Sequence, residues 1–257
     1  MKNRIVKILL ILGVMAIFMS CAKKESSGVD GGKKKYIVAT DTSFPPFEFK
    51  DSNNEYVRID IDLVKKIAEL EGFEVEFRPM DFGGIIPAIQ SGQVDDAIGG
   101  ARITEERKQT VDFSEPYYET GVIAVVKDDN NSIKTIDDLA GKKIAVKNGT
   151  EGAKLAEDAL KGKSNISVFE DSVSMYKAVE NGQADAAFED LPVAGYTIKI
   201  TPDSKLKIAT EKLTSGNYGF MTKKGANTEL MEKFNKGLKT LKESGEYDKI
   251  VEKYIGK

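Results

Sequence analysis

Two matching segments, one in each half of the chain, constrain the fold most strongly. The first reads Ala88-Ile-Gln-Ser-Gly-Gln-Val-Asp-Asp-Ala-Ile-Gly-Gly, and the second, ninety positions later, reads Ala178-Val-Glu-Asn-Gly-Gln-Ala-Asp-Ala-Ala-Phe-Glu-Asp. Each predicts a helix that ends at a glycine, then a turn, an aspartate and a short apolar strand, with Gly92 and Gly182 as left-handed caps. Helix-turn-strand is a common arrangement, but identities at one fixed offset favour two lobes of the same α/β build. We therefore expect a functional site in a cleft between two lobes.

The composition excludes several classes of function. The chain has 257 residues, a net charge of −3, no histidine and one cysteine. This length is sufficient for two domains. The lack of histidine and of a second cysteine excludes His-based triads, His-ligated metal sites, zinc clusters and intramolecular disulfides. Because Lys and Arg are spread throughout, nothing indicates nucleic-acid binding, and we expect neither a metal nor a cofactor.

Residues 1–20 are typical of a signal peptide. A positively charged start precedes an apolar run from Ile8 to Phe18, which is too short to span a bilayer comfortably. The run leads into Cys21 and resembles a bacterial lipobox, in which a peptidase cleaves before the cysteine and the thiol carries a lipid. Phe18 and Met19 differ from the usual residues. An ordinary secretory signal and an uncleaved anchor remain the alternatives to a lipidated Cys21.

Residues 21–35 are polar and rich in Gly, Ser and Lys, which is typical of a flexible tether. A lipid, a tether and a folded body together predict a protein held at the outer face of the cell membrane or in the periplasm. Such a protein would capture something outside the cell. We expect a monomer.

From Tyr36 onward the hydrophobic pattern alternates between strand and helix periods. Strands are expected at residues 36–40, 73–77, 95–99, 122–127, 143–147 and 166–169, and helices at 59–70, 82–91, 150–160, 173–181 and 228–255. Short alternating units of this kind predict parallel or mixed sheets covered by helices on both faces.

Six segments, in this order, carry a resemblance that covers the chain from Tyr36 to its end. They begin at Val38 (Val-Ala-Thr-Asp-Thr-Ser-Phe-Pro-Pro-Phe-Glu-Phe), Tyr56 (Tyr-Val-Arg-Ile-Asp-Ile-Asp-Leu), Pro79 (Pro-Met-Asp-Phe-Gly-Gly-Ile-Ile-Pro-Ala-Ile-Gln), Ile103 (Ile-Thr-Glu-Glu-Arg-Lys-Gln-Thr-Val-Asp-Phe-Ser), Val146 (Val-Lys-Asn-Gly-Thr) and Ala184 (Ala-Asp-Ala-Ala-Phe-Glu-Asp). Together they resemble the polar amino-acid-binding solute-binding proteins of ABC importers (family 3), and the glutamine-binding branch most closely.

The resemblance implies the two-lobe fold of periplasmic binding proteins of type II, with a mixed sheet flanked by helices in each lobe. Lobe 1 would comprise residues 36–119 and 216–257, and lobe 2 residues 120–215. The chain would cross between lobes near residues 117–121 and 214–218, and these two hinge strands would allow closure around a ligand. The implied function is capture of a free amino acid and its delivery to the permease subunits of an ABC importer.

The resemblance also assigns the two charged ends of the ligand. Arg107 matches the residue that binds the ligand carboxylate, and its planar guanidinium suits both oxygens. Asp190 matches the residue that binds the ammonium group, with help from the backbone carbonyl of Gly100. From the residues alone, Arg107 could equally be a solvated side chain in a charged helix start. Asp190 could also cap the helix that follows it, and the two roles are compatible, with the ammonium role favoured.

Other matched positions concern the rest of the ligand. Phe44 and Phe82 correspond to the aromatic pair that encloses its aliphatic part. Asp41 and Lys147 correspond to residues that read a side-chain amide in glutamine binders. Thr150, at a predicted helix start, could present its backbone N–H to the ligand carboxylate.

Three residues depart from the family pattern and leave the ligand open. Arg102 replaces a Ser or Thr, Glu151 replaces a small residue or Thr, and Glu189 precedes Asp190. Arg102 could point to solvent, pair with Glu189 or Glu151, or contact the ligand. If all face the cleft, four acids (Asp41, Glu151, Glu189, Asp190) oppose three bases (Arg102, Arg107, Lys147). This net of −1 favours a neutral or cationic ligand, so glutamine is expected first and arginine or another cationic amino acid second.

Two other functions remain open. The same fold includes enzymes like cyclohexadienyl dehydratase, in which a cleft carboxylate acts as general acid, and Glu151 or Glu189 could serve in that way. A sensor that presents its closed form to a receptor would require a separate partner. We expect a binding protein without catalysis.

Overall fold

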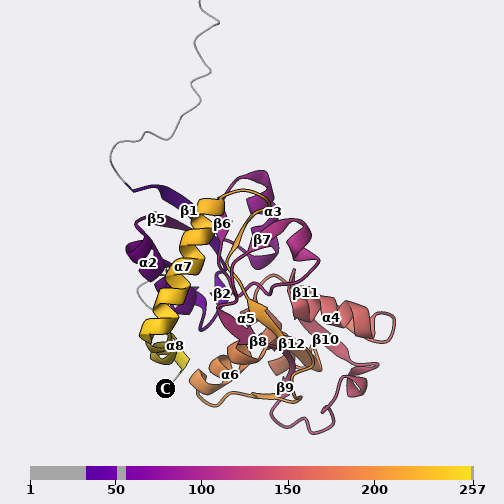
Figure 1. The fold of residues 1–257 in the computed structure, drawn as a ribbon. Helices are drawn as coiled ribbons and strands as arrows, with labels where there is room; N and C mark the ends of the chain where they lie inside the picture. The colour runs from indigo at the N-terminus through magenta and orange to yellow at the C-terminus, as the bar shows by residue number, and fades with distance from the viewer. Residues whose placement is uncertain (1–32, 51–55, 256–257) are drawn as a thin grey trace, which may run out of the picture. The chain divides into compact units, whose positions relative to one another are not determined.

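The computed structural model describes residues 33–50 and 56–255, in which strands and helices alternate as the sequence predicts (Figure 1). The signal peptide, Cys21 and most of the predicted tether lie outside these residues. The strands are β1 (Lys35–Thr40), β2 (Ser43–Phe44), β3 (Glu48–Lys50), β4 (Tyr56–Val57), β5 (Glu74–Pro79), β6 (Asp96–Ala97), β7 (Val111–Phe113), β8 (Tyr118–Thr120), β9 (Val122–Lys127), β10 (Lys143–Lys147), β11 (Asn165–Phe169), β12 (Ala186–Asp190), β13 (Leu206–Ile208), β14 (Gly216–Tyr218) and β15 (Met221–Lys223). The helices are α2 (Ile59–Glu71), α3 (Phe82–Ser91), α4 (Glu151–Leu160), α5 (Ser172–Glu180), α6 (Leu191–Ile200), α7 (Thr228–Ser244) and α8 (Glu246–Ile255), with short 3₁₀ turns at Arg107–Gln109 and Asp137–Leu139.

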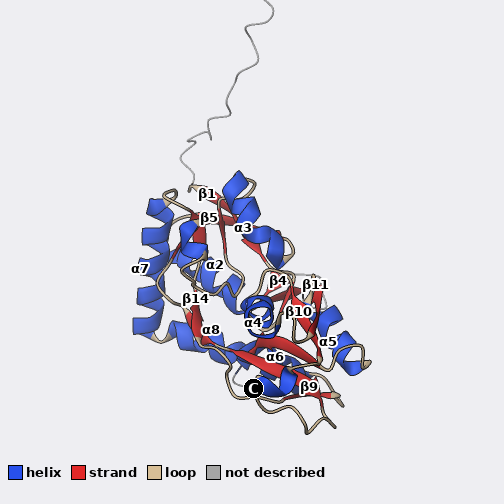
Figure 2. Cartoon of the chain, turned by 90° about the vertical axis from the view of Figure 1, so that its right-hand side faces the viewer, coloured by secondary structure: helices blue, strands red, loops and turns tan. Residues whose placement is uncertain are grey.

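One mixed sheet has the strand order β5-β1-β6-β15-β7 in the described ranges. β1 runs parallel to β5 and β6, whereas β15 runs antiparallel to β6 and β7. Successive side chains of a strand point to opposite faces. Val38 accordingly packs in the core with α2 and α7, and Ala39 packs in the core with α3. Figure 2 shows α7 and α3 on opposite sides of these strands.

A second mixed sheet has the order β11-β10-β12-β9-β13 within the described residues. β10 is parallel to β11 and β12, and β9 is antiparallel to β12 and β13. Ile144 and Val146 face the core under α4, while Ala145 faces the core under α5 and α6. Both faces of each sheet are therefore covered, as the near-continuous apolar runs predict.

The two matching sequence segments form the same local structure in both sheets. Gly92 ends α3 with φ 75°, and Gly182 follows α5 with φ 72°, so each takes the left-handed conformation that glycine adopts without strain. The aspartates that follow also have the same role. Asp95 accepts a hydrogen bond from the Ile37 amide at 2.8 Å, and Asp185 accepts one from the Lys143 amide at 2.8 Å. Each aspartate thus joins its segment to the neighbouring parallel strand.

Several predicted boundaries differ from the structure. The strand expected at 95–99 is regular only at Asp96–Ala97, because the chain turns at Gly100, where φ is 56°. The long C-terminal helix is divided into α7 and α8 at Gly245, which has φ 74°. β1 begins at Lys35, which the sequence assigned to the tether.

The chain passes from the first sheet to the second through β8 and returns through β14. These strands pair antiparallel, with Thr120 opposite Gly216 and Tyr118 opposite Tyr218. Because β15 belongs to the first sheet, the C-terminal part of the chain packs on the sheet that the N-terminal part begins. The fold class is confirmed as two lobes, each a mixed sheet flanked by helices.

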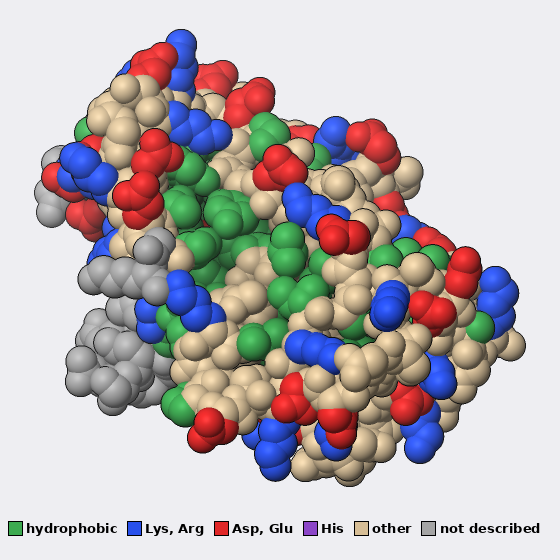
Figure 3. Space-filling view, turned by 90° about the horizontal axis from the view of Figure 1, so that it is seen from below, with side chains coloured by type: hydrophobic (Ala, Val, Ile, Leu, Met, Phe, Trp, Pro, Cys, Tyr) green, Lys and Arg blue, Asp and Glu red, His purple; other side chains and the backbone are tan. Residues whose placement is uncertain are grey.

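A groove of about 320 Å³ lies beside these connecting strands. It is lined mainly by Tyr118, Leu191, Pro192, Tyr196 and Ile255. The face on which α6 and the end of α8 lie shows hydrophobic side chains gathered in a hollow (Figure 3). None of the helices in the described ranges has the length and hydrophobicity needed to cross a bilayer.

Candidate functional site

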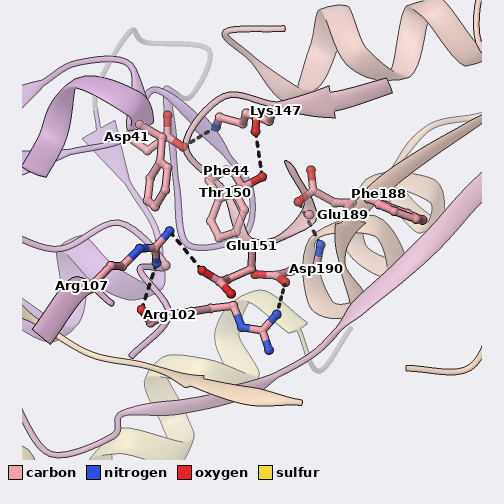
Figure 4. Close-up of a pocket in the computed structure, with 13 residues that line it drawn as sticks. Asp41, Phe44, Arg102, Arg107, Lys147, Thr150, Glu151, Phe188, Glu189 and Asp190 are labelled. Atoms are coloured by element: carbon pink, nitrogen blue, oxygen red, sulfur yellow. Dashed lines mark hydrogen bonds and ion pairs between the residues drawn. The ribbon is translucent and has the colours of Figure 1, made fainter. Parts of the chain in front are cut away.

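One pocket between the two sheets gathers all the residues predicted to bind the ligand (Figure 4). Its free volume is about 20 Å³, room for about one water molecule, so the side chains of the two lobes nearly fill the pocket. The first lobe contributes Asp41, Phe44, Phe82, Gly100, Arg102 and Arg107, and the second contributes Lys147, Thr150, Glu151, Glu189 and Asp190. Within the described ranges, no cluster of acidic or cysteine side chains is arranged to hold a metal ion.

Arg107 lies at the start of a 3₁₀ turn and is 9% exposed, so its alternative reading as a solvated side chain is wrong. One guanidinium nitrogen donates to the Arg102 carbonyl at 2.9 Å and another to the Gly149 carbonyl at 2.8 Å. The Glu151 carboxylate lies 3.8 Å away. Burial lowers the pKa of Arg107, and the charge of Glu151 opposes that shift. The guanidinium is thus held in place by backbone carbonyls from both lobes.

Asp190 occupies the N-cap position of α6, but its side chain makes no capping hydrogen bond. Instead, its carboxylate accepts a hydrogen bond from the Tyr218 hydroxyl at 2.6 Å and lies 3.8 Å from an Arg102 guanidinium nitrogen. Burial raises the pKa of Asp190, while the Tyr218 hydrogen bond and the Arg102 charge lower it. The carboxylate therefore faces the pocket rather than the helix end.

Arg102 is 5% exposed and donates to the Thr214 hydroxyl at 2.9 Å. A β-carbon on Gly216 would come within 2.6 Å of its guanidinium, so glycine makes room for the side chain there. Two expectations for Arg102 are therefore wrong, because it neither points to solvent nor pairs with Glu189 or Glu151. Its acidic partner is Asp190.

Asp41 and Lys147 form a buried ion pair that joins the two lobes, and each side chain is 1% exposed. The Lys147 ammonium also donates to the Ser43 hydroxyl at 3.2 Å, and Asp41 accepts from the backbone amides of Thr42 and Ser43. Lys147 lies 5.5 Å from the centre of the Phe44 ring. Asp41 and Lys147, which were expected to bind a side-chain amide of the ligand, thus form an ion pair with each other.

Glu189 is 4% exposed and has neutral partners. Its carboxylate accepts from the Ser172 hydroxyl at 2.9 Å and from the Asp190 amide at 2.9 Å. Burial, followed by repulsion from Asp190, raises the pKa of Glu189 to about 7. The side chain is therefore partly protonated near neutral pH.

Thr150 is the N-cap of α4, where its hydroxyl accepts from the Ala153 amide at 3.2 Å. The Thr150 amide itself is directed to the Lys147 carbonyl at 3.4 Å. The prediction that this amide serves the ligand is therefore weakened. The first-turn amides of Glu151 and Gly152 are the better donors, because they lie at the positive end of the helix.

Gly100 can only be glycine at its position. It has φ 56°, and a β-carbon there would lie 2.1 Å from the Phe44 ring. The Phe82 ring, which also lines the pocket, has its centre 5.4 Å from the Arg107 guanidinium. The two rings thus contribute electron-rich faces beside the charged groups.

Several residues of the site were missed from the sequence. Gly152 and Phe188 also line the pocket, and Tyr218 and Thr214 hold Asp190 and Arg102. Tyr218 and Thr214 lie in the predicted crossing at 214–218, so proximity to the cleft was the available signal. No sequence signal indicated Gly152 or Phe188.

The chain is similar to known proteins over nearly the whole of its folded part. Residues 36–257 match the model of the bacterial extracellular solute-binding proteins, family 3. The arginine-binding extracellular protein ArtP of Bacillus subtilis (strain 168) is 31% identical over 96% of this chain and 96% of that protein.

Solved structures show the same likeness. An ancestral arginine-binding protein bound to glutamine is 44% identical, with a TM-score of 0.82 over 88% of this chain and 99% of that one. The structure of an ancestral arginine-binding protein bound to arginine is 45% identical, with a TM-score of 0.80 over 86% and 98%. An ancestral amino acid-binding protein described as a precursor of cyclohexadienyl dehydratase is 40% identical, with a TM-score of 0.79 over 86% and 95%. These four comparisons concern binding proteins rather than enzymes.

Proposed function

The chain belongs to the bacterial extracellular solute-binding proteins of family 3, and we propose that it binds one free amino acid between its lobes for delivery to an ABC importer. One observation carries the proposal: a buried arginine, Arg107, and a buried aspartate, Asp190, line the same pocket. An amino acid carries a carboxylate and an ammonium group, and burying both is tolerable only with partners of opposite charge. This pair supplies them.

We propose a cationic amino acid, arginine first, as the ligand, and glutamine second. All seven charged side chains counted from the sequence line the pocket, so acids outnumber bases by one. The two phenylalanine rings favour a guanidinium or its aliphatic stem. The B. subtilis relative is named arginine-binding, which also supports this order. An arginine-binding relative bound to glutamine keeps glutamine as the alternative.

In this proposal the ligand carboxylate binds Arg107 and the first-turn amides of α4. The ammonium binds Asp190 and the Gly100 carbonyl. Phe44 and Phe82 enclose the aliphatic part. In the part of the pocket proposed for the ligand side chain, Glu189 is the acid whose hydrogen-bond partners are neutral. It would bind a cationic side chain.

A binding screen tests the proposal. The protein would be unfolded and refolded to remove any bound solute, then heated with each of the twenty amino acids. A ligand at about one hundred times its Kd adds about 2.7 kcal/mol to the free energy of unfolding, which is a readily measured shift. Arginine should give the largest shift, and Arg107→Ala should remove it. Binding retained by Arg107→Ala would refute the carboxylate assignment, and silence across the panel would refute the proposal.

We also propose that Cys21 carries a lipid that anchors the protein, as a monomer, at the outer face of the membrane or in the periplasm. The sequence motif and the extracellular class of the family support this reading. Cys21→Ala should move the protein from the membrane fraction to the soluble fraction or block its processing. Unchanged attachment of the variant would contradict lipidation.

A dehydratase remains the second candidate, because a pocket carboxyl with a raised pKa is typical of a general acid. Glu189 is such a group. The purified protein should leave prephenate and arogenate unchanged if it only binds. Turnover that is lost in Glu189→Gln would favour the enzyme.

A further inference from the structure

The pocket holds two ion pairs whose members all belong to the protein. Arg107 faces Glu151 at 3.8 Å, and Asp190 faces Arg102 at 3.8 Å. Figure 4 shows the two pairs beside each other. The side chains are largely buried, with 10% of Arg107, 21% of Glu151, 6% of Arg102 and 11% of Asp190 exposed. Solvent therefore screens these pairs less than it screens surface pairs.

Both pairs involve a group that the proposed function assigns to the ligand. The Glu151 carboxylate lies beside Arg107, where the ligand carboxylate is proposed to bind. The Arg102 guanidinium lies beside Asp190, where the ligand ammonium is proposed to bind. Together, Glu151 and Arg102 present to the pocket the same two charges as an amino acid backbone.

Resting on the proposed function, we infer that Glu151 and Arg102 are internal competitors that set the affinity and specificity of the pocket for complete α-amino acids. Binding exchanges partners: the ligand carboxylate replaces Glu151 on Arg107, and the ligand ammonium replaces Arg102 on Asp190. The net charge of the protein side chains is unchanged by this exchange. The displaced Arg102 keeps its hydrogen bond to Thr214.

The exchange favours ligands that bring both charges. The displaced Glu151 and Arg102 have opposite signs and line the same pocket, so they can pair with each other when both are released. A ligand with an ammonium group alone releases only Arg102 and leaves Glu151 on Arg107. With such a ligand Glu151 and Arg102 do not pair with each other, and only Asp190 changes its partner. Agmatine, which is arginine without its carboxylate, therefore gains no net ion pair, whereas arginine gains one.

The test uses the double variant Glu151→Gln/Arg102→Gln, which removes both competitors and keeps the net charge of the pocket. Kd values for arginine and glutamine would be measured by calorimetry. Even an ion pair at the surface contributes up to about 1 kcal/mol, so removing these less screened competitors should tighten the binding of both ligands about five-fold or more. The double variant should keep its preference for arginine over agmatine, because each ligand gains one more ion pair there than in the original protein.

A matched control is available at the rim of the cleft. Lys154 and Glu106 form an exposed pair at 3.4 Å that also joins the lobes but does not line the pocket. Lys154→Gln/Glu106→Gln removes the same number of charges, and its affinities should stay within about two-fold of the original. Thermal unfolding of all variants would show that they fold.

Each outcome decides the inference. Tighter binding of both ligands by the pocket double variant supports it, and unchanged or weaker binding overturns it. Loss of arginine binding by Glu151→Gln with glutamine unaffected also overturns it, because Glu151 would then read the ligand side chain. If neither the original protein nor any variant binds an amino acid, the proposed function itself is refuted, and the inference falls with it.

Discussion

Among the pocket carboxylates of the described residues, Glu189 is the one without an ion-pair partner. Asp41 and Asp190 each face a cation, whereas Glu189 accepts from a hydroxyl and an amide. Burial and the neighbouring Asp190 raise the pKa of Glu189 to about 7, and the charge of Lys147 partly offsets this. The Tyr176 hydroxyl also lies against Glu189. A ligand cation placed beside this carboxyl would favour its ionised form.

This predicts a pH dependence that separates arginine from glutamine. Below pH 7 Glu189 is protonated, so binding of a cationic side chain must release the proton; above pH 7 the proton is already gone. Arginine affinity should therefore rise between about pH 5.5 and 8, by roughly ten-fold per pH unit at most. Glutamine affinity should stay nearly flat. Calorimetric titrations at several pH values would measure both.

Glu189→Gln provides the control. The variant should bind arginine more weakly at pH 8 and should lose the slope. Asp96 also has a pKa raised to about 7, but it lies in β6 beside Asn227, outside the pocket, so it should not affect the slope. A flat arginine profile in the original protein would contradict the placement of the cation beside Glu189.

The identities of the pocket residues could be predicted from the sequence, but their partners could not. Each predicted pocket residue lies in a short motif at a strand end or a helix start, and such motifs could be matched in the sequence. The partners join distant positions across the two lobes. Arg102 meets Thr214, 112 positions away, and Arg107 meets Gly149, 42 positions away. Such contacts depend on how the lobes pack, which local patterns do not encode.

Two buried carboxyl groups, Glu48 of β3 and Asp60 of α2, lie near the loop that carries Gly100. Asp60, in the first turn of α2, accepts from the Tyr117 hydroxyl at 2.7 Å and from the Gly100 amide at 3.1 Å. Glu48 lies beside Asp60, and neither Glu48 oxygen has a hydrogen-bond partner in the described ranges. Burial raises the pKa of both acids. Burial therefore favours the neutral form of Glu48, which has no hydrogen bond to stabilise its charge, whereas Asp60 accepts from two donors.

The two acids should respond differently to substitution. Glu48→Gln places a neutral amide beside Asp60 and should change the free energy of unfolding by no more than about 1 kcal/mol. Asp60→Ala leaves the Tyr117 hydroxyl and the Gly100 amide without an acceptor and should cost about 2–3 kcal/mol. Asp60→Ala should also weaken ligand binding, because the Gly100 loop loses its support. Urea unfolding at pH 7 measures the stabilities, and equal costs for the two variants would contradict the support of this loop by Asp60.

Most helices and strands could be predicted from the spacing of apolar residues and from helix-capping residues. The errors have local causes. α3 has the predicted bounds, and α2 and α4 differ by one residue at one end. The division of α7 from α8 at Gly245 was missed, because hydrophobic spacing continues across the break. The shortness of β6 was missed as well. Its apolar residues continue past the regular strand to the turn at Gly100.

At the scale of the whole folded body, contacts between lobes link closure to the chemistry of the pocket. Asp41 follows β1 of the first sheet, and Lys147 ends β10 of the second. Their ion pair can form only when the lobes meet. The pair is almost fully buried, so closure removes both charges from water at once. Such a burial is tolerable only while both partners are present.

Loss of one partner should therefore favour an open arrangement of the lobes. Lys147→Gln leaves the Asp41 carboxylate to be buried without its cation, which costs about 3 kcal/mol or more on closure. Small-angle X-ray scattering should show a larger radius of gyration for this variant at saturating arginine. Its arginine affinity should fall by about 100-fold, since closure and binding are coupled.

The double variant Asp41→Asn/Lys147→Gln separates charge burial from the loss of a specific contact. Its amide groups can still bond to each other and to Ser43, and no unpaired charge is buried, so closure should be largely restored. Lys154→Gln at the exposed rim removes an inter-lobe charge of the same sign and should leave scattering and affinity nearly unchanged. Scattering and affinity of Lys147→Gln equal to those of the original protein would show that the pair does not govern closure. A double variant as open as Lys147→Gln would instead assign Lys147 a direct contact with the ligand.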